Sequence, residues 1–453
     1  MAETTAAVER SVEQRTIAKI SWRLLPLIVL IYFVAYIDRT NVGFAAIGMN
    51  KDLGFTAYMY GWGAGIFFLG YFLFEVPSNV ILHRIGARVW IARIMITWGV
   101  ASGAMMFITG FRSFLVVRFL LGVAEAGFFP GVLLYFTYWF PAVYRARVVA
   151  TLYLAAPGSN AAAAMISGAI LQLDGVWGIA GWKWVFLLES LPAVLLAPVV
   201  LAVMTDRPSM ATWLTDDERA WLNERMTREQ RAVENGRPPV TLLQALTNPR
   251  LLGLSMIYFT IVSATYGITF FLPLIVKSHG LSNVATGAVT AIPYAIGAIG
   301  MVLWAYSSDR RHERRWHIVI SSMVAASGLV AAGATSNLYW AIAALSVAAI
   351  GLYAHKPCFW PLPSMFLSGT AAAGGIALIN SIGNLGGFVG PYIVGWIKDS
   401  TQRYDAGLYF LAACALLSGI ITLFVVKAPA LAAPATPVTH VGAHRGVRLL
   451  WIA

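Results

Sequence analysis

Charged residues and cysteines are scarce in this sequence. Only 11% of its 453 residues are Asp, Glu, Lys or Arg, whereas a typical soluble domain has about 25%. Both cysteines, Cys358 and Cys414, lie in apolar runs, which favours packing over a disulfide or a metal site. The sequence also lacks a Walker loop, a cluster of metal ligands and a nucleophile elbow. These absences argue against a primary pump and against an enzyme, and we expect neither a metal nor a cofactor.

Long apolar runs dominate the chain instead, and 59% of its residues are hydrophobic. The runs are continuous rather than alternating, which is typical of membrane-spanning helices and not of barrel strands. A span needs about 20 mostly apolar residues. The sequence therefore predicts an all-α membrane protein with twelve spans, at 24–47, 58–82, 89–109, 113–138, 147–172, 184–204, 250–276, 285–307, 317–335, 338–361, 372–397 and 407–427.

A polar loop divides these spans into two sets of six. We expect a cytoplasmic tail at 1–23, a six-helix bundle at 24–204, a linker at 205–248, a second six-helix bundle at 249–427 and a disordered tail at 428–453. Within the linker, Thr215 followed by Asp216, Asp217 and Glu218 predicts the start of a surface helix. Basic loops containing Arg84 and Arg310 occupy matching places in the two bundles, which indicates a pseudo-repeat. The alternative is that each loop is only a basic anchor.

The distribution of Lys and Arg predicts the orientation. Most of those outside the spans fall in the tails, in the linker and in the loops that share its side. The other side has only Lys51, Arg112, Lys183, Lys277, Lys398 and Arg403. Both termini and the linker are therefore expected in the cytoplasm of a bacterial-type inner membrane. The net charge of +12 reflects this topology, and we expect no nucleic-acid partner.

Span 1 contains Asp38 and Arg39 next to each other. Each charge costs about 2.5–3.5 kcal/mol in a membrane helix, so a purely structural span would not be expected to carry both. Tyr32, Tyr36 and Arg39 follow helical spacing and form one polar stripe. Arg39 can hold a carboxylate through two hydrogen bonds, and Asp38 can carry a proton when buried. The alternative is a structural ion pair.

Span 4 places Arg118 and Glu125 two helical turns apart on one face. Glu125 has no neighbouring cation in the sequence, and a buried glutamate of that kind suits a proton site. Gly122 and Gly127 permit close helix packing. The alternative for Glu125 is a hydrogen-bonded packing residue.

Spans 10 and 11 offer further polar candidates. Lys356 and Trp360 lie one turn apart, and Lys356 is a second possible anion clamp unless it extends to the cytoplasmic interface. The neighbouring His355 can titrate near neutral pH. Asn380 and Asn384, four residues apart, are candidates for hydrogen bonds to a substrate. By contrast, we expect Glu75 and Glu189 to make helix-packing or loop contacts rather than to contact the substrate.

Several of these motifs resemble the anion:cation symporter family of the major facilitator superfamily. The resemblance rests on the runs Tyr36–Ala45, Phe74–Asn79, Ile91–Gly99, Arg118–Gly131 and Gly375–Gly387, and it covers about 17–427. It is closest to the tartrate permease branch, with phthalate and 4-hydroxyphenylacetate permeases nearby. It implies two six-helix bundles and proton-driven uptake of organic carboxylates by alternating access.

The resemblance also implies roles for single residues. It implies that Asp38 and Glu125 couple transport to protons, and that Arg39 and Arg118 correspond to the arginines that the family has in spans 1 and 4. It also implies that Tyr36, Tyr71, Trp360 and Asn380 line the substrate cavity. It implies gating for the loops that contain Arg84, Arg88, Asp309 and Arg310, although Asn79, His83 and Ala305 depart from the superfamily pattern there. Span 5 lacks the Gly-Pro-x-x-Gly pattern of antiporters. His355 and Lys356 stand where the tartrate branch has uncharged residues.

The predicted function is therefore proton-coupled symport of an organic carboxylate such as tartrate, by a monomer in the lipid bilayer. An anion entering a cell is opposed by about 2.3 kcal/mol per charge for each 100 mV, so a dianion needs protons to accumulate. Two alternatives stay open. One is a permease for aromatic acids of the phthalate or 4-hydroxyphenylacetate kind, and the other is an exchanger or uniporter of the same fold.

Overall fold

Helices account for all the regular secondary structure in the described part of the chain. The computed structural model describes residues 2–234, 247–363 and 369–426. Within these ranges, twelve helical segments are long and apolar enough to cross a membrane. This confirms the predicted all-α membrane fold with twelve spans. The predicted tail at 428–453 lies outside the described residues, and the boundaries of the two halves and the linker stay a prediction.

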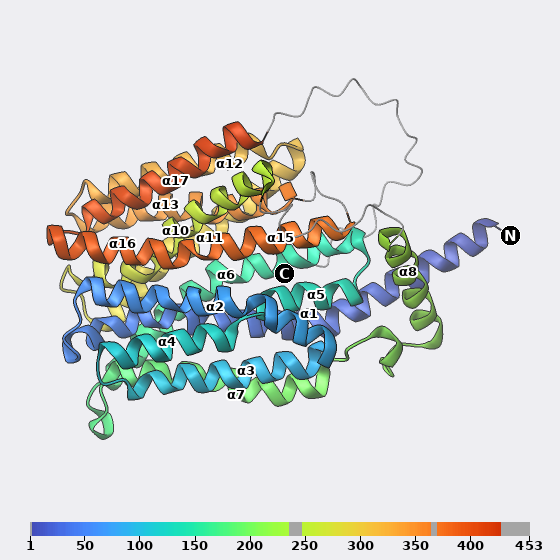
Figure 1. The fold of residues 1–453 in the computed structure, drawn as a ribbon, viewed down its shortest axis with the longest axis horizontal. Helices are drawn as coiled ribbons and strands as arrows, with labels where there is room; N and C mark the ends of the chain where they lie inside the picture. Colours follow the sequence, from blue (N-terminus) through green and yellow to red (C-terminus); the bar gives the residue numbers. More distant parts are fainter. Residues whose placement is uncertain (1, 235–246, 364–368, 427–453) are drawn as a thin grey trace.

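The two halves lie side by side, and Figure 1 shows their helices running in the same general direction, the first half in blue to green and the second in yellow to red. The first half consists of α1 (Ala2–Asp52), α2 (Ala57–Ile85), α3 (Ala87–Ala104), α4 (Phe111–Glu125), α5 (Phe128–Trp139), α6 (Ala142–Ile170) and α7 (Gly181–Val203). The second consists of α10 (Pro249–Lys277), α11 (Asn283–Arg311), α12 (Arg315–Gly333), α13 (Leu338–Phe359), α15 (Gly369–Asn384), α16 (Gly386–Thr401) and α17 (Asp405–Val425). The halves meet mainly along three helix pairs, α6 with α11, α2 with α16, and α1 with α10, and also where α2 contacts α15 and α6 contacts α13.

Two spans are each built from two helices. The span predicted at 113–138 is broken between α4 and α5, where Gly127 has a φ of +86° that favours glycine. The span predicted at 372–397 is broken between α15 and α16 at Leu385. Both breaks lie beside glycine-rich sequence, and the first one places Glu125 at the very end of α4.

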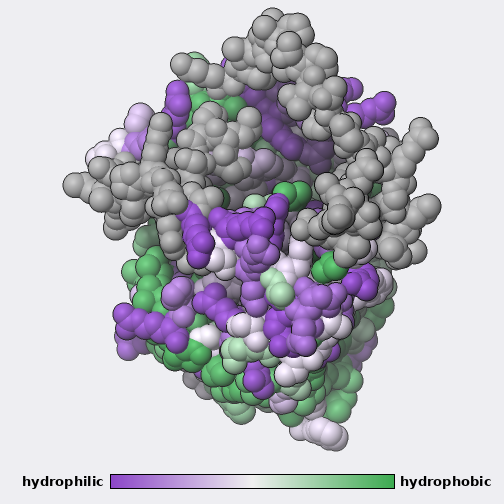
Figure 2. Space-filling view, turned by 90° about the vertical axis from the view of Figure 1, so that its right-hand side faces the viewer, coloured by the Kyte–Doolittle hydropathy of each residue, from purple (hydrophilic) through white to green (hydrophobic). Residues whose placement is uncertain are grey.

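One end of the bundle carries the start of α1, the helix α8 (Asp216–Glu234), and the turns after α2 and α11; we call it the arginine-rich end. Figure 2 looks at this end and shows many hydrophilic residues among its described atoms. Residues 2–23, the described part of the predicted tail, belong to the same continuous helix as the first span, α1.

The surface helix predicted in the linker is confirmed as α8. The backbone N–H of Thr215 donates to Glu218 at 3.0 Å, which is one half of a capping box. α8 is attached to α1 by ion pairs from Lys19 to Glu218 at 2.9 Å and from Arg15 to Asp217 at 3.1 Å. The helix therefore packs against the arginine-rich end of the first half.

At the opposite end, which we call the closed end, the two halves are in direct backbone contact. A Cβ added at Gly287 of α11 would lie under 3.0 Å from the carbonyl oxygen of Ala164 in α6. Asp399 of α16 accepts hydrogen bonds from the backbone N–H groups of Ala57 and Tyr58 at 3.0 and 2.9 Å, and thus caps α2 from the other half. Small residues and this cap hold the halves together at the closed end.

Candidate functional site

A buried cavity lies between the two halves, near the middle of the bundle. It offers about 30 Å³ of space to water-sized molecules, which is enough for about two waters. Residues from α1, α2, α5, α6, α10, α13 and α15 line it: Tyr32, Ala35, Tyr36, Arg39, Tyr71, Phe128, Phe129, Tyr153, Tyr258, Val262, Tyr266, Lys356, Asn380 and Asn384. We call it the central cavity. It brings together six of the eight predicted substrate residues, namely Arg39, Tyr36, Tyr71, Lys356, Asn380 and Asn384.

Arg39 of α1 is the cation of the first half that faces this cavity. One of its amino groups donates to the hydroxyl of Tyr266 in α10 at 3.1 Å, and the other pairs with the carboxylate of Glu125 in α4. Its guanidinium also lies over the rings of Tyr36 and Tyr71, at 5.3 and 5.6 Å from their centroids. The guanidinium is therefore held by both halves.

The ion pair with Arg39 corrects the prediction that Glu125 has no adjacent cation. Glu125 is 1% exposed and Arg39 12% exposed in their side chains. The arginine is 86 positions away in the sequence, and its long side chain reaches Glu125 only because α1 and α4 lie in the same half. Within the described residues, the proton-coupling candidate and the anion-binding candidate thus contact each other directly.

Asp38 points away from Arg39, into the interior of the first half. Its carboxylate accepts hydrogen bonds from the indole N–H of Trp98 at 2.9 Å and the hydroxyl of Ser102 at 2.7 Å, both in α3. It is 1% exposed and does not line the central cavity. The alternative of a structural ion pair between Asp38 and Arg39 is therefore wrong, because neighbouring side chains of a helix point in different directions.

Lys356 of α13 is the cation that the second half contributes to the cavity. It is 6% exposed, and its ammonium lies 5.7 Å from the centroid of the Tyr353 ring. The side chain therefore points into the protein and does not extend to the interface. His355 faces the other way and shares a hydrogen bond of 3.0 Å with Ser418 of α17, so it takes no part in the cavity.

Two predicted substrate residues do not line the cavity. Trp360 packs behind it against the rings of Tyr258 and Tyr153, with centroid distances of 4.9 and 6.4 Å. Arg118 is fully buried and donates to the backbone carbonyls of Gly63 and Ala64 in α2, at 3.3 and 3.0 Å. In this conformation Arg118 joins α4 to α2, and its role in substrate binding stays a prediction.

The sequence interpretation missed most of the aromatic lining. Tyr153, Tyr258 and Tyr266 face the cavity with Phe128 and Phe129, but nothing in their local sequence separates them from ordinary aromatic packing residues. The only available signal was hydroxyl-bearing tyrosine in the interior of an apolar span, where a buried hydroxyl needs a partner. For Tyr266 that partner is Arg39.

Glu75 of α2 is a further buried carboxylate that contacts the second half. It accepts hydrogen bonds from the amide of Asn380 at 2.6 Å and from the hydroxyl of Ser381 at 3.0 Å. We predicted a helix-packing role, and these contacts do join α2 to α15. Since Asn380 also lines the central cavity, Glu75 lies immediately beside the site.

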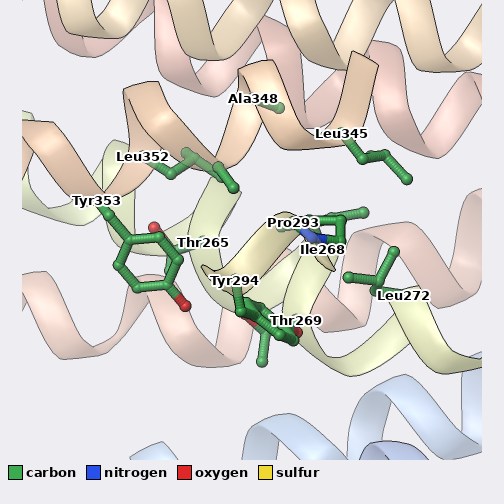
Figure 3. Close-up of a pocket in the computed structure, with 11 residues that line it drawn as sticks. Thr265, Ile268, Thr269, Leu272, Pro293, Tyr294, Leu345, Ala348, Leu352 and Tyr353 are labelled. Atoms are coloured by element: carbon green, nitrogen blue, oxygen red, sulfur yellow. The ribbon is translucent and has the colours of Figure 1, made fainter. Parts of the chain in front are cut away.

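A second, smaller cavity of about 20 Å³ lies within the second half, between α10, α11 and α13 (Figure 3). Its polar groups are the hydroxyls of Thr265, Thr269, Tyr294 and Tyr353, and the rest of its lining is apolar. Among the described residues that line it, none has a charged side chain. It therefore has no group that could neutralise an anion.

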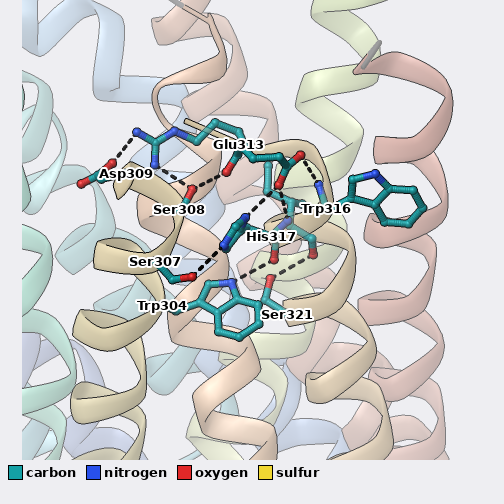
Figure 4. Close-up of polar contacts among 10 residues, drawn as sticks. Trp304, Ser307, Ser308, Asp309, Glu313, Trp316, His317 and Ser321 are labelled. Carbon is teal, nitrogen blue, oxygen red and sulfur yellow. Dashed lines mark hydrogen bonds and ion pairs between the residues drawn. The ribbon is translucent and has the colours of Figure 1, made fainter. Parts of the chain in front are cut away.

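The loops predicted to gate the transporter make contacts with their own half or with the start of the linker. Arg88 donates its backbone N–H to Asp206 at 2.8 Å and its side chain to the carbonyl of Leu201 at 2.6 Å. Asp309 is paired with Arg314 of the same turn, and Figure 4 shows the polar network around this turn, where Glu313 accepts the N–H of Trp316. Arg84 and Arg310 are exposed. The gating role of these loops stays a prediction.

The chain is similar to known transporters over most of its length. The family model described as Major Facilitator Superfamily matches residues 28–391. A protein of Agrobacterium vitis named putative tartrate transporter is 49% identical over 93% of both chains. A quinolone resistance transporter of Acinetobacter baumannii is 40% identical over 92% of this chain and 96% of its own.

The fold agrees with a solved structure. The inward-facing, unoccupied structure of a bacterial homologue of the human lysosomal transporter Spinster has a TM-score of 0.72 and 19% sequence identity, and the match covers 91% of this chain and 99% of that one. This likeness shows the fold alone, while the sequence matches show the family. The chain therefore belongs to the Major Facilitator Superfamily, and it is a multi-pass membrane transporter rather than an enzyme.

Proposed function

We propose that the protein takes up a small organic carboxylate, such as tartrate or a related hydroxy-diacid, together with protons. The observation that carries this proposal is that two buried cations from opposite halves, Arg39 and Lys356, line the same cavity. A dicarboxylate can engage one cation with each of its carboxylates. Binding would then pull the two halves together around the substrate.

The two cations suit different parts of this task. Arg39 presents a planar fork that can bind one carboxylate through two hydrogen bonds, whereas Lys356 acts as a point charge with rotatable donors. The amides of Asn380 and Asn384 and the tyrosine hydroxyls can pair with the hydroxyl groups of a hydroxy acid. The relative named putative tartrate transporter, at 49% identity, supports this substrate class.

The pairing of Arg39 with Glu125 supplies a means of proton coupling. An ionised Glu125 competes with a substrate carboxylate for the same guanidinium. Protonation of Glu125 removes this competition, so a proton and an anion bind together. Asp38, held by Trp98 and Ser102, is the second proposed proton carrier.

Two further proposals concern the membrane. The arginine-rich end faces the cytoplasm, as the excess of Lys and Arg predicts, and the membrane is a bacterial inner membrane. The closed end then faces outwards. Since the central cavity has room for only about two waters, the substrate enters and leaves only when the halves move apart at one end, which is alternating access.

Uptake into proteoliposomes tests the coupling. Wild-type protein should accumulate labelled tartrate when the outside is acidic and the inside is negative, and a protonophore should abolish accumulation. Glu125→Gln should lose part of the stimulation by acid, and the double variant with Asp38→Asn should lose all of it. Glu224→Gln, which changes an exposed carboxylate of α8, is the matched control. Acid-stimulated accumulation that survives in the double variant would refute proton coupling through these residues.

The aromatic lining of the central cavity favours a second candidate substrate class. Flat aromatic acids can stack between rings such as Tyr36, Phe129 and Tyr258 while one carboxylate engages Arg39. Phthalate and 4-hydroxyphenylacetate should therefore be included as competitors of tartrate uptake. Counterflow that does not depend on pH would instead indicate an exchanger or a uniporter of the same fold.

A further inference from the structure

Glu75 is a buried carboxylate that the coupling mechanism above does not use. It lies in α2, is 2% exposed, and belongs to the first half. Both of its oxygens accept hydrogen bonds from α15 of the second half, from Asn380 at 2.6 Å and from Ser381 at 3.0 Å. A carboxylate with a donor on each oxygen makes the contacts of an ionised group. Glu75 therefore ties the two halves together.

The contact of Glu75 with Asn380 and Ser381 lies beside the central cavity, where the substrate is proposed to bind. Glu75 lies one helical turn beyond Tyr71, on the side of the central cavity that leads to the arginine-rich end. Asn380 lines that cavity and at the same time donates to Glu75. The amide of Asn380 thus lies within reach of two carboxylates, the one of Glu75 and the one that a bound substrate would bring.

We propose that Glu75 stands in for the substrate carboxylate in the empty transporter. While the cavity holds no anion, Glu75 keeps the donors of Asn380 and Ser381 satisfied and holds α2 against α15. When an organic anion binds at Asn380, it takes over the amide and its charge repels Glu75, so the contact breaks. The inference rests on the proposed uptake of a carboxylate and adds a residue that governs the return of the empty transporter.

The physical reason is the burial of the donors. Asn380 is 6% exposed and Ser381 8% exposed, and a buried donor without a partner is unfavourable. An empty transporter that changes its conformation must keep these donors paired inside the bilayer. Glu75 is the carboxylate that pairs them in the described structure, and it does so from the opposite half.

This proposal predicts that loss of Glu75 affects net uptake more than exchange. Net uptake requires the empty transporter to return, whereas exchange of internal for external substrate requires only the loaded form to move. Glu75→Ala should lower net tartrate uptake by about tenfold or more, because two hydrogen bonds to a charged group are lost. Exchange, measured as counterflow, should stay within about twofold of wild type. Ser381→Ala, which removes one donor, should lower net uptake by less.

A matched control separates this role from general destabilisation. Glu189 of α7 is also a buried carboxylate, but it accepts a hydrogen bond from the hydroxyl of Ser167 in α6, which belongs to the same half, at 2.6 Å. Glu189→Ala should therefore leave the ratio of net uptake to counterflow unchanged. A parallel fall of both modes in Glu75→Ala and Ser381→Ala, or no change in either variant, would overturn the proposal.

A second measurement is independent of substrate identity. Spin labels at H83C, near the end of α2, and at W316C, near the start of α12, report the separation of the halves at the arginine-rich end; Cys358 and Cys414 are replaced beforehand. Without substrate, Glu75→Ala should add a population with a longer distance. Unchanged distances would overturn the contact proposed here. A wild-type protein that moves no carboxylate would refute the proposed function, and the distances would still test the tie between α2 and α15.

Discussion

The contact between α6 and α11 gives the most direct prediction about alternating access. At the closed end these helices belong to different halves and meet at Gly168 and Gly287. A Cβ added at Gly287 would lie under 3.0 Å from the carbonyl oxygen of Ala164 and 3.0 Å from the Cα of Gly168. Both neighbours are backbone atoms and cannot move aside as a side chain could. Gly287→Ala must therefore separate the two helices.

The size of the effect follows from this overlap. Forcing an extra methyl group into a well-packed contact costs about 1–3 kcal/mol. The cost applies to the conformation in which α6 and α11 touch, and not to one in which the closed end has opened. The equilibrium between these conformations should therefore shift by a factor of about 5–150 toward the open form. Gly158→Ala, in the same α6, is the control, because an added Cβ there meets no atom within 4 Å.

Distances between spin labels measure this shift. Trp177, between α6 and α7, and Tyr339, at the start of α13, are each 84% exposed at the closed end. With labels at W177C and Y339C in a background without the native cysteines, Gly287→Ala should gain a population with a longer distance, and Gly158→Ala should match the parent protein. A distribution for Gly287→Ala that coincides with the control would refute the close-contact reasoning.

Three further predictions concern other contacts. Arg39→Lys keeps the charge but loses the planar fork, so the Kd for tartrate should rise by about tenfold or more in calorimetry; an unchanged Kd would remove Arg39 from the site. Asp399→Ala removes the cap of α2, which should cost about 1 kcal/mol and lower the Tm, whereas an equal Tm would mean that the cap contributes nothing. Burial raises the pKa of Glu218, but the Thr215 backbone N–H and the Lys19 ammonium outweigh it, so the pKa lies below the ordinary value. The attachment of α8 should thus be fully present above about pH 4.3 and be lost as the pH falls through the lowered pKa; hydrogen exchange of α8 that is equally slow at lower pH would contradict this.

The fold was predictable because the bilayer imposes a length on each apolar run. Twelve windows of apolar residues corresponded to the twelve helical spans in the described part of the chain. The acidic start of α8 was evident from Thr215 and the residues after it. The helix breaks at Gly127 and Leu385 were not predictable. Glycine-rich sequence is compatible both with a tightly packed continuous helix and with a broken one, and tertiary contacts decide between them.

The polar residues of the candidate site were predictable from the sequence, but the residues that they contact were not. Charged and amide side chains such as Arg39, Lys356 and Asn380 are conspicuous inside apolar spans. Placing such groups in the bilayer costs free energy, so those that occur there are usually functional. Their partners were not predictable. The distances between Arg39 and Glu125, or between Glu75 and Asn380, depend on how helices from distant parts of the chain pack, and no local pattern encodes this.

Two of the buried carboxylates contact residues that are proposed to bind the substrate. Glu125 forms an ion pair with Arg39, and Glu75 accepts a hydrogen bond from Asn380. Each carboxylate thus contacts a group that the proposed substrate would bind. Asp38 differs, because its partners Trp98 and Ser102 lie away from the central cavity. In the empty protein, Arg39 and Asn380 are thus already paired with internal carboxylates, whereas Lys356 lies beside the ring of Tyr353. A substrate must displace these carboxylates to bind, and protonation of Glu125 weakens one of them. Anion binding therefore becomes linked both to a proton, through Glu125, and to the contact between the halves, through Glu75.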